Sequence, residues 1–128
     1  PLNGNLHEFG YYPVSPTEAG RDFLPDELHV TEAHYHTFTL PGGVTLLATG
    51  ESYANQAFRY GDKVYGVQFH PECTAEIFCR WQQSETAVYG QPGAQSREEQ
   101  DRLMTLHDQA QGAWFNGFLG RLFLEDRP

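Results

Sequence analysis

The chain has 128 residues, 39% of them hydrophobic, and a formal net charge of −9 at pH 7. This size allows a buried core, but the acidity is a poor electrostatic match for nucleic acid or an anionic membrane surface. No apolar run approaches the roughly 18 residues of a membrane span, no secretory signal is visible, and two cysteines are too few for a disulfide framework, so we expect a soluble, cytoplasmic protein.

The first part of the chain has the composition of a β-rich fold. Its apolar runs are short, contain many aromatic and β-branched residues, and are separated by turns containing Pro, Gly and Asp. The last two runs flank a short Gly-Asp-Lys turn, which is typical of a β-hairpin. The predicted strands are residues 6–14, 29–40, 44–49, 55–60 and 64–69.

The pattern becomes helical after Glu72. Thr74 precedes a helix predicted over residues 75–83, and Ser96 is a plausible cap for a long helix that reaches about residue 123. Strands followed by helices predict an α/β or α+β domain. The apolar residues of the long helix recur every three or four positions and are expected to face the core: Leu103, Leu106, Ala110, Trp114, Phe118 and Leu122.

The most informative segment is Tyr65-Gly66-Val67-Gln68-Phe69-His70-Pro71-Glu72. It is a short apolar strand that ends in a histidine and a carboxylate two positions apart. Proline disfavours the helical conformation for the residue before it, so His70 should stay extended, and the fixed φ of Pro71 then turns the chain. A general base and the acid that orients it can be presented in this way at the end of a strand. The simpler interpretation is a strand end with a solvated carboxylate.

This segment closely resembles the His/Glu motif of class I glutamine amidotransferases, which use a Cys-His-Glu triad. The segments 8–14, 33–41 and 55–62 and the long terminal helix also resemble that family. The resemblance implies an α/β fold in which the whole chain, residues 1–128, is a single partial domain. That domain would be the C-terminal half of a flavodoxin-like class I glutamine amidotransferase domain, with β strands followed by helices.

The resemblance also implies roles for individual residues. His70 would take the proton of the nucleophilic thiol and return it to the departing ammonia, and Glu72 would hold the imidazole in the required tautomer. His34, Tyr35 and His36 would line the substrate pocket. The implied substrate is the side-chain amide of glutamine or a related γ-glutamyl bond, and the family implies neither a cofactor nor a metal.

The nucleophile of that family lies in a Gly-x-Cys-x-Gly turn, and the sequence contains no such turn. Cys73 is adjacent to Glu72, and adjacent residues cannot easily face the same reacting carbon. Cys79 falls within the predicted helix 75–83, where a small buried thiol is the usual interpretation. We therefore expect the chain to supply His70 and Glu72 but no nucleophile, and to be inactive alone.

Two alternatives remain open. The chain could be a non-catalytic remnant that acts as an oligomeric binding or scaffolding protein, or a metal-binding protein that uses His34, His36 and His70. The strand 64–69 is apolar enough to be covered on both faces, so the missing half would leave an open sheet edge. We therefore expect either a homo-oligomer, most simply a homodimer, or a complex with an upstream N-terminal half.

Overall fold

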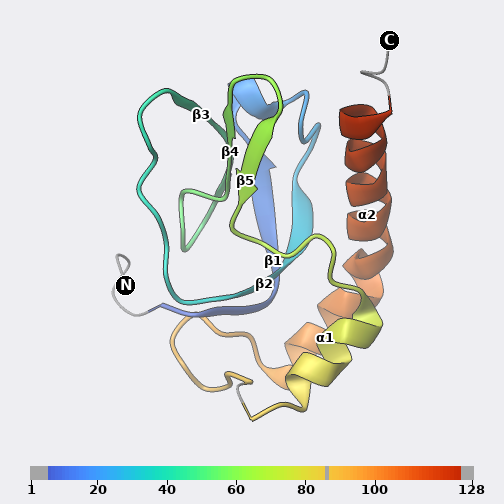
Figure 1. Ribbon diagram of the computed structural model, residues 1–128. Helices are drawn as coiled ribbons and strands as arrows, with labels where there is room; N and C mark the ends of the chain where they lie inside the picture. The colour runs from blue at the N-terminus through green and yellow to red at the C-terminus, as the bar shows by residue number, and fades with distance from the viewer. Residues whose placement is uncertain (1–5, 86, 125–128) are drawn as a thin grey trace.

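The computed structural model describes residues 6–85 and 87–124, in which strands precede helices as predicted (Figure 1). The elements are β1 (Glu8–Pro16), the short 3₁₀ helix η1 (Glu18–Gly20), β2 (Leu28–His34), β3 (Val44–Gly50), β4 (Ala57–Tyr60), β5 (Val64–Val67), α1 (Ala75–Gln82) and α2 (Arg97–Phe123). Thr74 and Ser96 cap the two α helices, as predicted, because their side-chain oxygens accept hydrogen bonds from backbone N–H groups of the first turns.

The strands form one antiparallel sheet in the order β2-β1-β3-β4-β5. The sheet curls because β1 pairs with β2 over Glu8–Val14 and with β3 only near its end. The curl brings the segment after β5 back to β2, where the His70 N–H donates to the Thr31 carbonyl at 2.8 Å. His70 is therefore held between the two ends of the sheet.

The predicted hairpin is confirmed as β4 and β5, whereas the second predicted strand is too long. β2 ends at His34, and residues 35–43 form no strand. Side chains satisfy the backbone of this loop in place of a neighbouring strand. The Tyr53 hydroxyl donates to the Tyr35 carbonyl, and the Asn55 amide donates to the Phe38 carbonyl.

β5 is shorter than the predicted strand 64–69, and it lies at the edge of the sheet. β5 pairs only with β4, and the side chains of Val64 and Val67 are 58% and 41% exposed. Nothing in the described residues covers the outer side of β5. The open sheet edge expected from the sequence is therefore present.

Both helices lie on one side of the curled sheet, with α2 running along its length (Figure 1). Two apolar clusters form the core. The first lies inside the curl and contains Val14, Phe23, Leu24, Val30, Leu47, Ala48, Ala57 and Phe69, with Trp114 and Phe118 of α2 against it. The second joins the start of β1 to both helices and contains Phe9, Tyr11, Cys73, Phe78 and Leu103.

The predicted apolar stripe of α2 is only partly correct. Leu103 is buried, but Leu106 is 61% exposed. The inner face instead carries two fully buried glutamines, Gln100 and Gln111, which bond to the strands; the Gln100 amide, for example, donates to the Phe9 carbonyl at 3.0 Å. Within the described residues, no helix is both long enough and apolar enough to cross a membrane.

Two histidines stack where β2 meets α2. The rings of His29 and His107 lie 3.8 Å apart and are nearly parallel, at 5°. Burial lowers the pKa of both side chains. For His29, the charge of His107 lowers the pKa further, as does Arg102, whereas Glu27 raises it. For His107 the second cause is Arg102. The folded state therefore favours neutral rings.

This pair predicts an acid-sensitive contact. A lowered folded-state pKa contributes stability that is present above the ordinary histidine pKa of 6.5 and is lost as pH falls below it. Between about pH 7.5 and about pH 5.5, His107→Gln should therefore lose less thermal stability than wild type. Thermal melts followed by circular dichroism check this, with His36→Gln as the control. Equal losses for wild type and His107→Gln would contradict it.

Candidate active site

His70 and Glu72 form a hydrogen-bonded pair. The Nδ1 of His70 lies 2.9 Å from Oε1 of Glu72, and the two side chains are 41% and 56% exposed. An ionised carboxylate only accepts hydrogen bonds, so the ring proton sits on Nδ1. Nε2 is then the nitrogen with a free lone pair, which is the arrangement that a general base requires.

Local contacts fix the orientation of the His70 ring. Its backbone N–H donates to Thr31 on β2, and its carbonyl accepts from the Cys73 N–H at 3.1 Å, which closes a tight turn around Pro71. Trp81 of α1 meets the ring edge to face, with ring centres 5.2 Å apart. The base is therefore held by the sheet on one side and by α1 on the other.

Gln111 of α2 ties this turn to β2. Its Oε1 accepts from the Thr31 N–H at 2.7 Å, and its Nε2 donates to the Thr31 hydroxyl at 2.9 Å and to the Cys73 carbonyl at 3.3 Å. The side chain is 0% exposed. The sequence pattern does not indicate a role for Gln111, because apolar periodicity passes over a polar residue.

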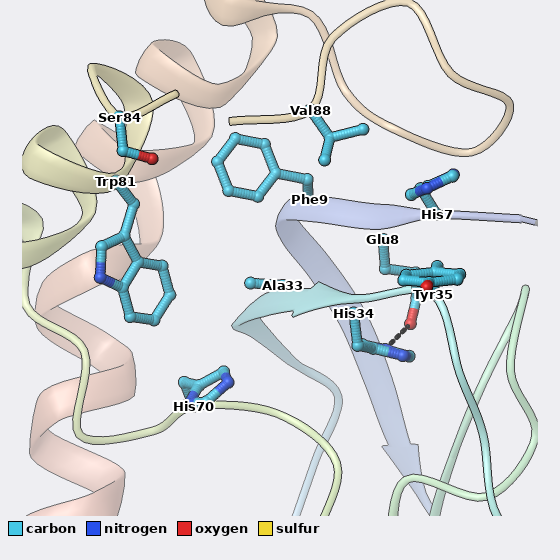
Figure 2. Close-up of a pocket in the computed structure, with 10 residues that line it drawn as sticks. All are labelled: His7, Glu8, Phe9, Ala33, His34, Tyr35, His70, Trp81, Ser84 and Val88. Atoms are coloured by element: carbon cyan, nitrogen blue, oxygen red, sulfur yellow. Dashed lines mark hydrogen bonds and ion pairs between the residues drawn. The ribbon is translucent and has the colours of Figure 1, made fainter. Parts of the chain in front are cut away.

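His70 faces a cavity of about 430 Å³. Figure 2 shows His70 and Trp81 toward one side of it, and His34 and Tyr35 toward the other. The walls are mainly apolar, with a few polar groups. The lining residues are His7, Glu8, Phe9, Ala33, His34, Tyr35, His70, Trp81, Ser84 and Val88.

The three residues predicted to bind substrate have different positions. His34 and Tyr35 line this cavity, whereas His36 is not among its lining residues and its ring contacts Tyr35 instead. Glu72 lines a separate hollow together with Cys73. His70 thus lies between the cavity and its carboxylate partner.

A buried cluster that the sequence analysis did not identify adjoins the cavity. His34 Nε2 lies 2.8 Å from Glu8 Oε1 and 3.1 Å from Glu32 Oε1, and the carboxylates are 2% and 0% exposed. Glu8 is directly opposite His34 across β1 and β2. Glu32 and His34, two positions apart on a strand, share a face. That Glu-x-His spacing was the available signal.

Burial and hydrogen bonding shift both titrations in this cluster. Burial raises the pKa of Glu32 to about 8, which keeps it protonated at neutral pH. Burial alone would lower the pKa of His34, but its hydrogen bonds to Glu32 and Glu8 outweigh that effect and raise the pKa to about 10. The cluster therefore holds a proton on Nε2 of His34, against the carboxylates.

The structure does not gather the histidines of the metal-binding alternative. The predicted strand 29–40 would have placed His34 and His36 on one face. That prediction is wrong, because β2 ends at His34. Nδ1 of His34 bonds to the His36 carbonyl at 2.8 Å, and Nε2 bonds to the two glutamates. In the described part of the chain, the residues with ligand atoms close enough for one ion are Glu8, Glu32 and His34.

Neither cysteine has the environment of a reactive thiol. Cys73 is 3% exposed, and burial raises its pKa to about 12, so it stays protonated. Cys79 is half-buried in α1, with its sulfur 4.0 Å from that of Met104.

No family model matches the chain. It is 40% identical over 76 residues to the glutamine amidotransferase-like protein YfeJ of Salmonella typhimurium, a match that covers 54% of this chain and 31% of YfeJ. The matched region is therefore only part of the length of YfeJ.

Solved structures of glutamine amidotransferases are also similar to this chain. The glutamine amidotransferase of Methylobacillus flagellatus matches with a TM-score of 0.81 and 27% identity, over 91% of this chain and 52% of that one. A Thermotoga maritima glutamine amidotransferase matches with a TM-score of 0.76 and 27% identity, over 94% and 52%. The chain spans about half the length of these structures. In sequence and fold, the chain is therefore similar to about half of a glutamine amidotransferase chain.

Proposed function

We propose that this chain supplies the general base and its orienting carboxylate for hydrolysis of the glutamine side-chain amide, or of a related γ-glutamyl bond. The observation that carries the proposal is the 2.9 Å contact between His70 Nδ1 and Glu72, which leaves Nε2 of His70 free at the edge of a cavity. The thiol nucleophile comes from a complementary half, the N-terminal half of the same fold.

In this mechanism, Nε2 of His70 accepts the thiol proton as the thiolate attacks the amide carbon. The imidazolium then returns that proton to the leaving nitrogen, the C–N bond breaks, and ammonia departs, which leaves the thioester. Water then attacks the thioester carbon and gives a proton to Nε2. That proton passes to the sulfur, and the thiol leaves as the carboxylic acid forms. Glu72 stabilises the positive ring in both steps and keeps Nδ1 protonated.

The cavity wall would position the substrate. Tyr35 and His34 lie across the cavity from His70, where they could contact the part of the substrate beyond the reacting amide, and His36 would act through its contact with Tyr35. Phe9 and Trp81 would limit access of water, which strengthens electrostatic contacts at the reacting carbon.

The open edge at β5 supports a requirement for a partner. Val64 and Val67 are exposed on an edge strand, and Val67 lines an apolar hollow together with Phe123 of α2; proteins usually cover edges and surfaces of this kind. The chain spans only about half of the structures that it matches, so the complementary half is the occupant we favour. The two free cysteines suit a reducing, cytoplasmic compartment.

The solution mass of the 128-residue chain distinguishes this proposal from a self-sufficient oligomer. If the complementary half is required, light scattering after size exclusion should show aggregates, or a 14.5 kDa monomer that binds a hydrophobic dye. A sharp homodimer without dye binding would instead favour the non-catalytic oligomeric protein.

The catalytic proposal is tested by supplying the nucleophile. The matching half of the Methylobacillus flagellatus amidotransferase can be fused upstream of this chain, and ammonia release from glutamine measured. His70→Asn should lower the rate by about 10³-fold or more and Glu72→Gln by a smaller factor, because proton transfer by a positioned base contributes about 10²–10⁴. His107→Asn and Glu76→Gln are the matched controls.

A folded fusion that releases no ammonia, or one in which His70→Asn retains full activity, would overturn the proposal. A fusion that does not fold leaves a second measurement on the chain itself. The nitrogen chemical shifts of the neutral His70 ring should report a proton on Nδ1 and none on Nε2. The opposite tautomer would exclude Nε2 as the base.

A further inference from the structure

We infer that Glu8, Glu32 and His34 form a binding site for a divalent transition-metal ion of the Zn²⁺ type at the wall of the cavity. The site shares only His34 with the histidine set considered from the sequence, and it contains neither His70 nor Glu72. It therefore does not depend on the proposed glutaminase function.

The ligand atoms are already close to the geometry of a metal site. His34 Nε2 lies 2.8 Å from Glu8 Oε1 and 3.1 Å from Glu32 Oε1, and the three ligand atoms lie within 4.8 Å of one another. Zinc bonds of about 2.0–2.1 Å to nitrogen and oxygen place neighbouring tetrahedral ligands about 3.3 Å apart. For an ion in place of the protons on His34 and Glu32, the two distances from Nε2 to the carboxylates would change by only a few tenths of an ångström.

The second ring nitrogen of His34 has the partner that metal-binding histidines usually have. Nδ1 lies 2.8 Å from the backbone carbonyl of His36, to which it must donate its proton. A histidine that ligates a metal through one nitrogen typically donates the other N–H to a carbonyl or carboxylate, which fixes the ring orientation. Once Nε2 is deprotonated, its lone pair therefore points at the two carboxylates.

An unpartnered buried oxygen gives independent support. Among the residues that the structure describes, none forms a hydrogen bond with Oε2 of Glu32, although Glu32 is 0% exposed. A buried polar atom without a partner carries a substantial free-energy cost, and a cation bound by this carboxylate would remove it. The Gln56 amide also donates to Glu8, with Nε2 3.3 Å from Oε1, and helps to hold that carboxylate in position.

The donor set indicates which ion would bind. One imidazole nitrogen with two carboxylates suits Zn²⁺, whereas Mg²⁺ and Ca²⁺ prefer sites built from oxygen alone. Once the ion has displaced the protons of Glu32 and His34, two ionised carboxylates neutralise the divalent charge in a buried position. Three protein ligands leave a fourth position open. Because Glu8 and His34 also line the cavity, that position would face it and could accept water or an oxygen of a cavity ligand.

The test is Zn²⁺ binding to the chain after treatment with a chelator, measured by isothermal titration calorimetry. We expect one ion per chain. Glu32→Gln and His34→Ala should weaken binding by more than about 100-fold, because loss of an outer partner alone costs about 10–100-fold. His36→Ala keeps the backbone carbonyl and should bind as wild type does, as should His70→Ala.

Two results would overturn the inference. One is the absence of a one-to-one complex in a chain shown by circular dichroism to be folded. The other is a loss of binding in His36→Ala or His70→Ala as large as in His34→Ala, which would assign the ion to the other histidine set. If the substituted chains do not fold, X-ray absorption spectra of the wild-type zinc complex decide, since one imidazole with oxygen ligands is expected and two or more imidazoles would contradict the site.

Discussion

A chain carrying Gly20→Ala is expected to lose more than about 4 kcal/mol of unfolding free energy, which is a large share of the stability of a small domain. A Cβ atom at Gly20 would lie 1.8 Å from the Leu47 carbonyl oxygen and 2.6 Å from its carbon. Both atoms belong to the backbone, so no rotation of a side chain can relieve the overlap.

The backbone at Leu47 cannot move away easily. Leu47 is the extra residue of a bulge in β3, where the pairing with β4 shifts register, and its carbonyl accepts from the Thr17 N–H at 2.9 Å. The Thr17 hydroxyl in turn donates to the Leu46 carbonyl at 2.7 Å and accepts from the Gly20 N–H at 3.1 Å. These bonds hold η1 directly against β3. Phe23 and Leu24, which come after η1 in the chain, lie in the core.

Urea unfolding followed by circular dichroism measures this effect, and Gly112→Ala is the matched control. Gly112 lies within α2, and a Cβ there would meet nothing within 4 Å. Alanine should stabilise that helix position by up to about 1 kcal/mol. Similar midpoints for the two variants would show that η1 can separate from β3 and would contradict the argument.

Features set by neighbouring residues could be predicted from the sequence. Thr74 and Ser96 begin helices because a cap needs only its own side chain and the first turn. The hairpin of β4 and β5 follows from its short turn, in which Gly61 has a φ of +65°. The contact of His70 with Glu72 spans two positions and needs only the turn that Pro71 imposes.

Features set by strand register could not be predicted. The cluster of Glu8, Glu32 and His34 exists because β1 and β2 pair with Glu8 opposite His34, and residues so far apart in the sequence give no local signal of that register. The end of β2 at His34 was missed for a similar reason. It depends on side chains of Tyr53 and Asn55, which lie beyond the next strand.

The same distinction applies to the support of the candidate base. The motif around His70 indicates the chemistry, but the structure shows that the turn is also held from α2 through Gln111, 41 positions after His70. Apolar periodicity assigns such a position to solvent. In this fold it is fully buried, because Thr31 of β2 offers it a backbone N–H donor and a hydroxyl acceptor, and Cys73 of the turn offers a carbonyl acceptor.

Gln111→Leu should therefore lower the unfolding free energy by about 3 kcal/mol or more, and should disorder the turn that carries His70. Leucine has a similar size but leaves the Thr31 N–H and hydroxyl and the Cys73 carbonyl without this partner, and each unsatisfied buried group costs about 1–3 kcal/mol. Gln109→Leu, on the exposed side of the same helix, is the control and should change stability by no more than about 0.5 kcal/mol.

Two measurements separate loss of stability from loss of the site. Urea unfolding gives the free energies, and amide hydrogen exchange of His70 and Cys73 under folding conditions reports the turn itself. In Gln111→Leu these two amides should exchange faster than those of β3 and β4, whereas a purely global effect would accelerate all of them together. Unchanged exchange at His70 would mean that the bond to Thr31 and the contact with Trp81 hold the base without help from α2.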